Sequence, residues 1–137
     1  MIRIRRVEPE TVRDMCDLLL RAEDNESTWK PDAEYWGAFD GPELVGYAGV
    51  IPSSSFSDVV FLCNAGVLPR ARGKHLQRRL IRARLHWAKR EEYIYARTYT
   101  VTFNPASARS LIACGFKPYW PRYPWAGDSV CYWYRVL

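Results

Sequence analysis

Apolar positions recur along the chain with two different spacings, and each spacing predicts a different kind of element. Segments that alternate apolar with polar residues, or form short β-branched runs, are expected to be strands. These segments are residues 2–7, 35–39, 44–51, 59–67, 93–102, 117–119 and 130–136. The run 59–67 is the most apolar, so we expect it to lie in the middle of the sheet.

Three other segments place apolar residues three or four positions apart, which is the spacing of a helix that buries one face. The first runs from Thr11 to about Ala22, after Pro9. The second follows Gly73, and its expected inner stripe is Leu76, Leu80, Ala83 and Trp87, with Ile81, Leu85 and Ala88 beside them. Its expected outer face is basic and comprises Arg78, Arg79, Arg82, His86, Lys89 and Arg90.

The third helix is marked at both ends. Asn104 is a favourable N-cap, Pro105 suits the first helical position, and Gly115 suits the residue after the last turn. Between the strands at 35–39 and 44–51, the sequence Asp-Gly-Pro-Glu of residues 40–43 predicts the turn of a hairpin.

Composition narrows the class of protein. A length of 137 residues with 48% hydrophobic content fits one domain over residues 1–137. The chain has no apolar run of membrane-spanning length, and its N-terminus lacks the apolar core of a signal peptide, so we expect a cytoplasmic protein without a membrane partner. The four cysteines are scattered without any Cys-x-x-Cys pair, which favours reduced thiols and predicts neither a metal site nor disulfides.

Charge is distributed unevenly along the chain. Residues 1–43 hold eleven acidic and six basic side chains, a net charge of −5, whereas the whole chain has +5, so the remainder carries +10. A basic half suits an anionic ligand such as a phosphorylated cofactor or a nucleic acid, and an acidic half suits a cationic one such as an amine. Two ordinary charged surfaces would give the same pattern.

The basic segment of residues 67–76 lies where the apolar strand hands over to the second helix. The first N–H groups of a helix have no internal partner and lie at the positive end of its dipole, so a turn that exposes them binds anions. Gly73 allows close backbone approach, and Arg70, Arg72 and Lys74 add positive charge. The sequence therefore predicts a phosphate site here.

The order of these parts resembles the GCN5-related N-acetyltransferase (GNAT) superfamily. Val67-x-Pro69-x-x-Arg72-Gly73-Lys74 matches the family's acetyl-CoA pyrophosphate loop, Gln/Arg-x-x-Gly-x-Gly/Ala, with Arg70 in the first position. Asn104-x-x-Ser107 through Gly115-Phe116 matches the family's later Asn-x-x-Ala/Ser…Gly-Phe segment. The two motifs follow in the family's order within residues 59–119.

The resemblance implies an α/β (α+β) fold with a mixed, mostly antiparallel sheet that is flanked by helices and splayed at the cofactor strand. It implies acetyl-CoA as the cofactor, with the pantetheine arm paired to the edge of that strand and the pyrophosphate held by the loop. The implied cofactor-binding residues are Ala65, Val67, Arg70, Ala71, Arg72, Gly73, Lys74, His75, Asn104 and Ser107.

Four residues depart from the family pattern. Gln77 stands where many members have another Gly. His75 stands where the family has Gly or Ala, and we expect a helical backbone there that still offers its N–H, with a side chain that crowds or touches the cofactor. Leu111 replaces the Tyr that protonates the departing thiolate in many members, and Tyr99 replaces the Glu base of one branch. A bound water is one substitute, and the candidate side chains are Tyr99, Asp58 and a Tyr of the 119–123 segment such as Tyr119.

The resemblance implies a transferase that acetylates a primary amine, on a small molecule or a protein, by direct attack. Candidate acceptor-binding residues are Glu26, Trp29 and Tyr123, from an acidic stretch and an aromatic loop. Two alternatives remain: a GNAT-like module that binds nucleic acid or modifies a base, and a protein that binds CoA without turnover. The pattern leaves monomer and homodimer open.

Overall fold

A computed structural model describes residues 1–20, 29–102 and 104–137 of the chain. Its elements in order are β1 (Ile2–Val7), α1 (Pro9–Leu20), β2 (Glu34–Asp40), β3 (Glu43–Pro52), β4 (Val59–Val67), the 3-10 turn η1 (Pro69–Ala71), α2 (Leu76–Arg90), β5 (Tyr95–Val101), α3 (Pro105–Ala113), β6 (Lys117–Tyr119) and β7 (Val130–Val136). Every strand and helix expected from the hydrophobic pattern is therefore confirmed, with shifts of one or two residues at several ends. The end expected for the first helix, near Ala22, lies outside the described residues.

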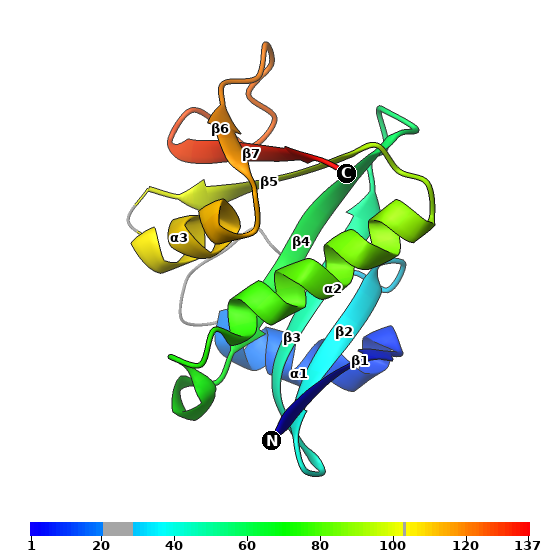
Figure 1. The fold of residues 1–137 in the computed structure, drawn as a ribbon, viewed down its shortest axis with the longest axis vertical. Coiled ribbons are helices and arrows are strands. Elements are labelled where there is room, and N and C mark those ends of the chain that lie inside the picture. Colours follow the sequence, from blue (N-terminus) through cyan, green and yellow to red (C-terminus); the bar gives the residue numbers. More distant parts are fainter. Residues whose placement is uncertain (21–28, 103) are drawn as a thin grey trace.

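The strands form one seven-stranded sheet in the order β1-β2-β3-β4-β5-β7-β6 (Figure 1). All neighbouring strands are antiparallel except β4 and β5, which are parallel. The parallel pair needs a crossover connection, and α2 supplies it. The expected mixed, mostly antiparallel sheet is confirmed, and β4 lies at its centre.

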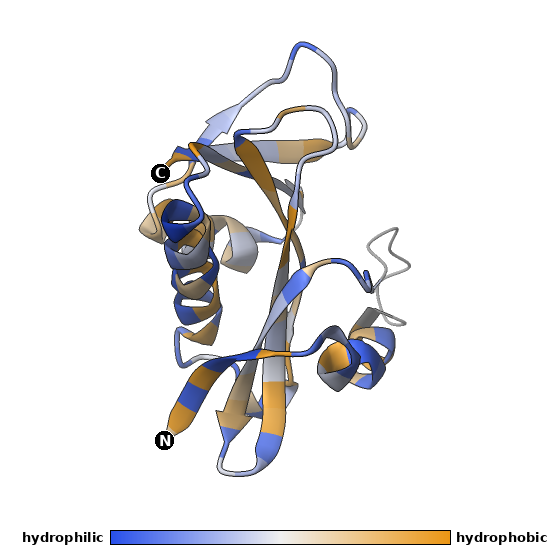
Figure 2. Cartoon of the chain, turned by 90° about the vertical axis from the view of Figure 1, so that its right-hand side faces the viewer, coloured by the Kyte–Doolittle hydropathy of each residue, from blue (hydrophilic) through white to orange (hydrophobic). Residues whose placement is uncertain are grey.

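The helices cover opposite faces of this sheet. Figure 2 shows the sheet nearly edge-on, with α1 on one side and the other two helices on the other. Leu80 of α2 and Leu111 of α3 belong to the larger apolar core, which includes Val60 of β4. Val12 and Cys16 of α1 pack in a second core on the other face. We call these the helix face, covered by α2 and α3, and the α1 face.

The inner stripe of α2 differs from the prediction at three positions, one of which is Ala83, expected inside but only partly buried. Arg84 is 3% exposed and lies in the buried stripe, four residues after Leu80, whereas Trp87 is only half-buried. Trp87 instead packs at the helix margin, with its ring centroid 6.0 Å from that of Trp36. The buried face of α2 therefore includes position 84, and the guanidinium of Arg84 lies in the core.

The thiols expected to be reduced are free, and three of the four, Cys16, Cys63 and Cys114, are buried. Within the described ranges, no helix combines the length and the apolar character needed to cross a membrane.

Candidate functional site

The two central strands separate after their first three residues. β4 and β5 pair only from Val59 opposite Tyr95 to Phe61 opposite Arg97. Beyond that point β4 continues along β3 to Val67, while β5 continues along β7 to Val101, and the two strands diverge (Figure 1). The edge of β4 after Phe61 therefore has no strand partner on the β5 side within the described structure.

Side chains satisfy the first two carbonyl groups at this divergence. The Thr98 hydroxyl donates to the carbonyl oxygen of Leu62 at 2.9 Å. Arg84 Nη1 donates to the carbonyl oxygens of Cys63, at 3.3 Å, and Gly49, at 3.0 Å. Because the register between β3 and β4 shifts between Ala48 and Gly49, these bonds fasten α2 to an irregular point of the sheet.

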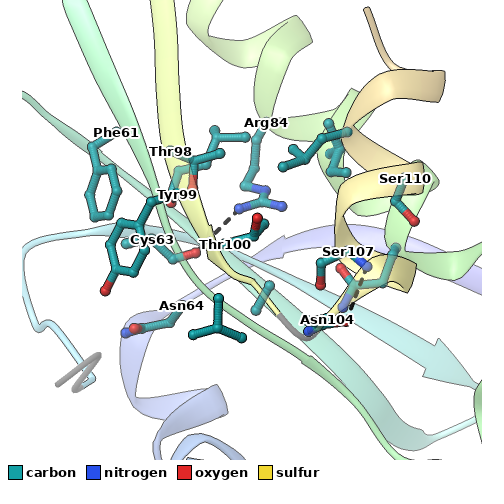
Figure 3. Close-up of a pocket in the computed structure, with 16 residues that line it drawn as sticks. Phe61, Cys63, Asn64, Arg84, Thr98, Tyr99, Thr100, Asn104, Ser107 and Ser110 are labelled. Carbon is teal, nitrogen blue, oxygen red and sulfur yellow. Dashed lines mark hydrogen bonds between the residues drawn. The ribbon is translucent and has the colours of Figure 1, made fainter. Parts of the chain in front are cut away.

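The diverging strands enclose a cleft of about 180 Å³. Phe61 and Tyr99 line one side of it, and Ser107 and Ser110 of α3 line the opposite side (Figure 3). Arg84 points between the strands from α2. The cleft is thus reached by side chains from both faces of the sheet, and it has no carboxylate among the described residues that line it.

The turn that leads into α2 has an unusual backbone. Gly73 has φ +81° and His75, the N-cap of α2, has φ +55°. The expectation of a helical backbone at His75 is wrong: the residue is in the left-handed region, where glycine is favoured because a Cβ meets the carbonyl oxygen. Its imidazole is exposed.

This turn leaves main-chain donors open. The N–H groups of Ala71 and Arg72 are bonded inside the turn, to the carbonyl oxygens of Leu68 and Pro69. The N–H groups of Gly73 and the two residues after it have no hydrogen-bond acceptor in the described part of the chain. These N–H groups directly precede the N-terminus of a fifteen-residue helix, so the turn has the donors of an anion site.

The arginines of the turn have protein partners. Arg70 pairs with Glu43 at 2.6 Å and lies 3.9 Å from Asp40, both in the β2–β3 hairpin. Arg72 Nε donates to the carbonyl oxygen of Val67 at 3.0 Å. Both side chains thus hold the turn against the sheet.

The start of α3 borders the cleft as the sequence predicts. Asn104 Oδ1 accepts the N–H of Ser107 at 3.2 Å, which confirms Asn104 as the N-cap. Both residues line the cleft, and so does Leu111, one turn further along α3. Leu111 is 5% exposed and has no proton to donate.

Aromatic side chains cover the α1 face next to the cleft. We call Phe61, Tyr99, Tyr119, Trp120, Trp125 and Tyr132 the aromatic cluster. The Trp125 ring centroid lies 5.4 Å from that of Phe61, 5.6 Å from Tyr99 and 5.1 Å from Tyr132, with the rings edge to face. The Arg97 guanidinium carbon lies over the Trp125 ring, 4.9 Å from its centroid. Trp125 therefore supports the two rings that line the cleft.

Buried hydroxyl and thiol groups lie under α1. The Tyr35 hydroxyl accepts from Asn64 Nδ2 at 3.0 Å, and Asn64 itself lines the cleft. Burial raises the pKa of Tyr35 and of Tyr47, and it raises the pKa of Cys63 to about 11. These groups are neutral at pH 7, so Arg84, whose pKa burial lowers to about 10, is the charged side chain among the described residues that line the cleft.

Of the candidate catalytic side chains, Tyr99 lines the cleft. Asp58 precedes the paired end of β4, where its carbonyl oxygen accepts from Tyr95 N–H at 3.1 Å. The Tyr119 hydroxyl accepts from Trp125 Nε1 at 3.4 Å within the aromatic cluster. Neither Asp58 nor Tyr119 lines the cleft.

Of the three candidate acceptor-binding residues, the two that the structure describes, Trp29 and Tyr123, do not line the cleft. Trp29 Nε1 donates to the carbonyl oxygen of Pro9 at 2.8 Å, and Arg13 lies over the ring, so this side chain braces the start of α1. Tyr123 is 79% exposed on the loop between β6 and β7. Glu26 lies outside the described residues.

Sequence reasoning missed Arg84. A usable signal was present, because position 84 is four residues after Leu80 and three after Ile81, both expected inside. A charged residue in an apolar stripe is either satisfied in the core or placed there for function.

Comparison with known proteins gives a family. The profile of the Acetyltransferase (GNAT) family matches residues 3–116. Solved structures with the same fold include an IAA acetyltransferase from Bacillus cereus ATCC 14579, with a TM-score of 0.81, 16% identity and 100% coverage of both chains. The protein yncA of Salmonella typhimurium, solved with its cofactor acetyl-CoA, has a TM-score of 0.77 and 15% identity, covering 98% of this chain and 93% of that one.

A ribosomal-protein-alanine N-acetyltransferase from Brucella melitensis has a TM-score of 0.76 and 17% identity, covering 98% of this chain and 99% of that one. No curated protein matches the sequence. At these identities the structural neighbours establish the fold, and the family profile carries the assignment.

Proposed function

Because the chain belongs to the GNAT acetyltransferase family, whose members use acetyl-CoA, we propose that it transfers an acetyl group to a primary amine by direct attack. One observation carries the proposal: the cleft opens between β4 and β5 and is lined from both faces of the sheet. Two substrates approaching from opposite faces would meet there without a covalent enzyme intermediate. Catalysis then comes largely from holding the amine and the thioester in position.

The helix face fits acetyl-CoA. The open N–H groups of residues 73–75 suit the pyrophosphate, and a Cβ added at Gly73 would meet no atom within 4 Å, so the turn leaves room for a bound group. The unpaired edge of β4 suits an extended arm that pairs as a strand would. We propose as cofactor-binding residues Ala65, Val67, Arg70, Ala71, Arg72, Gly73, Lys74, His75, Asn104 and Ser107.

The α1 face fits the acceptor. Phe61 and Tyr99 offer flat apolar walls beside the divergence, and Trp125 holds their rings in place by edge-to-face contacts. The lining holds no carboxylate among the described residues, so the amine would enter uncharged or lose its proton to water. We keep Tyr99 as the candidate for acid–base help because it lines the cleft, and we expect Tyr123 and Trp29 to contribute less.

The test is calorimetric titration with acetyl-CoA and with CoA, followed by thiol release in the presence of a panel of primary amines. We expect micromolar binding with one site, and thiol release that depends on the amine. Matched alcohols serve as the control for amine specificity. Binding without thiol release across the panel would favour a CoA-binding protein without turnover, and absence of binding would contradict the proposal.

A second candidate function is nucleic-acid binding, in addition to or in place of transfer. A groove away from the cleft, between α2 and the end of α3, is lined by Arg82, His86, Lys89 and Arg135. Binding through such a groove would be electrostatic and would weaken steeply with added salt. If a single-stranded RNA and a DNA duplex both fail to bind at low salt, this candidate is excluded.

A further inference from the structure

Arg84 is a buried cation without an acid to balance it. Its side chain is 3% exposed, and no carboxylate of the described residues forms an ion pair with it. Its Nε donates to the carbonyl oxygen of Leu80 at 3.2 Å, and Nη1 donates to those of Gly49 and Cys63. Burying an unpaired charge is costly, so its retention in a core stripe calls for an explanation.

The geometry of the guanidinium directs it at the cleft. A guanidinium carries five N–H donors, and the bonds above use the one on Nε and those on Nη1. The two on Nη2 have no hydrogen-bond acceptor in the described part of the chain. Arg84 lines the cleft at the point where β4 leaves β5, between Cys63 and Thr98 (Figure 3).

The other titratable groups around Arg84 do not neutralise it. The neighbours that act on it electrostatically are Cys63 of β4 and Cys114 at the end of α3. Burial raises the pKa of both thiols, so both are uncharged at neutral pH. The cleft is therefore bordered by a buried positive charge that no ionised group among the described residues offsets.

The proposed transfer produces a negative charge on the leaving group in the cleft that Arg84 lines. The amine lone pair forms the C–N bond, the C–S bond of the thioester breaks, and its electron pair stays on sulfur as a thiolate. The amine proton goes to solvent. Leu111, at the position where many family members carry a proton-donating Tyr, lines the cleft and offers no proton.

We propose that Arg84 stabilises the departing thiolate, so that the leaving group is released as an anion facing a guanidinium and is protonated by water afterwards. This role rests on the proposed acetyl transfer. Arg84 would thereby take the place of the proton donor that Leu111 does not provide. Its charge is already oriented by three main-chain carbonyls. Preorganised charge of this kind acts without reorganisation during the reaction.

Binding of the product provides a readout that does not depend on turnover. We would titrate the protein with CoA and with desulfo-CoA, which lacks the thiol, at pH values from 7 to 9, where Arg84, with a pKa of about 10, remains mostly protonated. A stabilised thiolate predicts that the preference for CoA over desulfo-CoA rises with pH across this range, by several-fold for a thiol pKa that is about one unit lower in the bound state.

Substitutions at Arg84 separate the effect of its charge from its contribution to folding. Arg84→Gln retains donors for the main-chain carbonyls but removes the charge, and we expect loss of the pH-dependent preference and a fall in kcat of about 100-fold. Arg84→Lys keeps the charge and should retain the preference, with kcat within about tenfold of the unaltered protein. Arg3→Gln, an exposed position on β1, is the matched control and should change neither quantity.

The outcomes distinguish a failure of the Arg84 proposal from a failure of the proposed acetyl transfer. A preference that is constant from pH 7 to 9 in the unaltered protein overturns the role of Arg84, and so does an Arg84→Gln protein that keeps both the preference and kcat. If Arg84→Gln does not fold, the titration of the unaltered protein and of Arg84→Lys still decides. Absence of acetyl-CoA binding overturns the proposed function itself, which binding without pH dependence does not.

Discussion

The two faces of the sheet meet at the divergence of β4 and β5, and each borders the cleft with different chemical groups. On the helix face the cleft is bordered by main-chain groups, by serines of α3 and by one buried cation, Arg84. On the α1 face it is bordered by aromatic rings that contact one another edge to face and stacked, with Phe61 and Tyr99 at 6.1 Å between centroids. The helix face of the cleft therefore depends on backbone shape, and the α1 face on side-chain packing.

This difference explains what each face is suited to recognise. Open N–H groups at a helix start fit a phosphate whatever the neighbouring side chains are, so the helix face is suited to a constant ligand. Ring walls select by shape and apolar area, which changes with each substitution, so the α1 face is suited to determine acceptor choice. Variants on the two faces should therefore affect different kinetic constants.

The largest effect is expected at the turn before α2. Gly73→Asp places a negative charge against the pyrophosphate site, and we expect acetyl-CoA affinity to fall by more than about 100-fold. Gly73→Asn is the matched control, since it has the same shape without the charge, and both residues tolerate a positive φ better than most. Equal affinities of the two variants in calorimetry would mean that the phosphate site is elsewhere.

A smaller effect on a different constant is expected from Trp125→Ala. Loss of this ring removes the support of Phe61 and Tyr99, so the KM for the acceptor should rise about tenfold while the Kd for acetyl-CoA stays within about twofold. Trp120→Ala is the control, because Trp120 is 59% exposed and its one ring contact among the described residues is with Tyr132. A weakened acetyl-CoA affinity in Trp125→Ala would show that the two faces are not independent.

The Cys63 thiol, at the boundary of the faces, should make the free energy of unfolding fall at alkaline pH. Its pKa is raised from 9.0 to about 11 by burial, so the folded protein keeps a proton that the unfolded chain loses above pH 9. Stability should then fall between pH 9 and 11, by about 2 kcal/mol from this group. Urea unfolding of Cys63→Ala should show a shallower fall over that range, and parallel curves would contradict the assignment.

The smallest effects contrast the two histidines. His75 is at φ +55°, so His75→Gly relieves backbone strain and should raise the free energy of unfolding by up to about 1 kcal/mol. His86 is exposed in the middle of α2, where His86→Gly should lower it by about 0.5 kcal/mol. Urea unfolding measures both, and two changes of the same sign would refute the strain at His75.

The helix face was largely readable from the sequence. The apolar run of β4, the basic turn with Gly73 and the Asn104 cap are local patterns, and each specifies its own element. The pairing of Arg70 with Glu43 was not readable, because it joins the turn to a hairpin 27 residues away in the chain. His75 was misjudged because its side chain gives no sign of a left-handed backbone.

The α1 face was readable only as a list of aromatic residues. Their grouping depends on the register of β5, β6 and β7, which sets Tyr99 opposite Tyr132 and Tyr119 opposite Tyr132 from the other side. Trp29 follows an acidic stretch and Trp125 lies in an aromatic loop, and both segments lack periodicity, yet one residue braces α1 and the other supports the cleft. Long-range packing decided between them, and local pattern does not report it.

The central claim is that acetyl-CoA enters the cleft from the helix face. The most direct test is a titration followed by ¹⁵N–¹H correlation spectra, with one indole reporter on each face: Trp133 Nε1–H, bonded to the Thr100 hydroxyl at 2.9 Å, and Trp125 Nε1–H. We predict that acetyl-CoA shifts the amides of residues 62–67 and 73–75 and the Trp133 indole, and leaves the Trp125 indole nearly unchanged. Shifts confined to Trp125 and its neighbours, with residues 73–75 unmoved, would contradict the account.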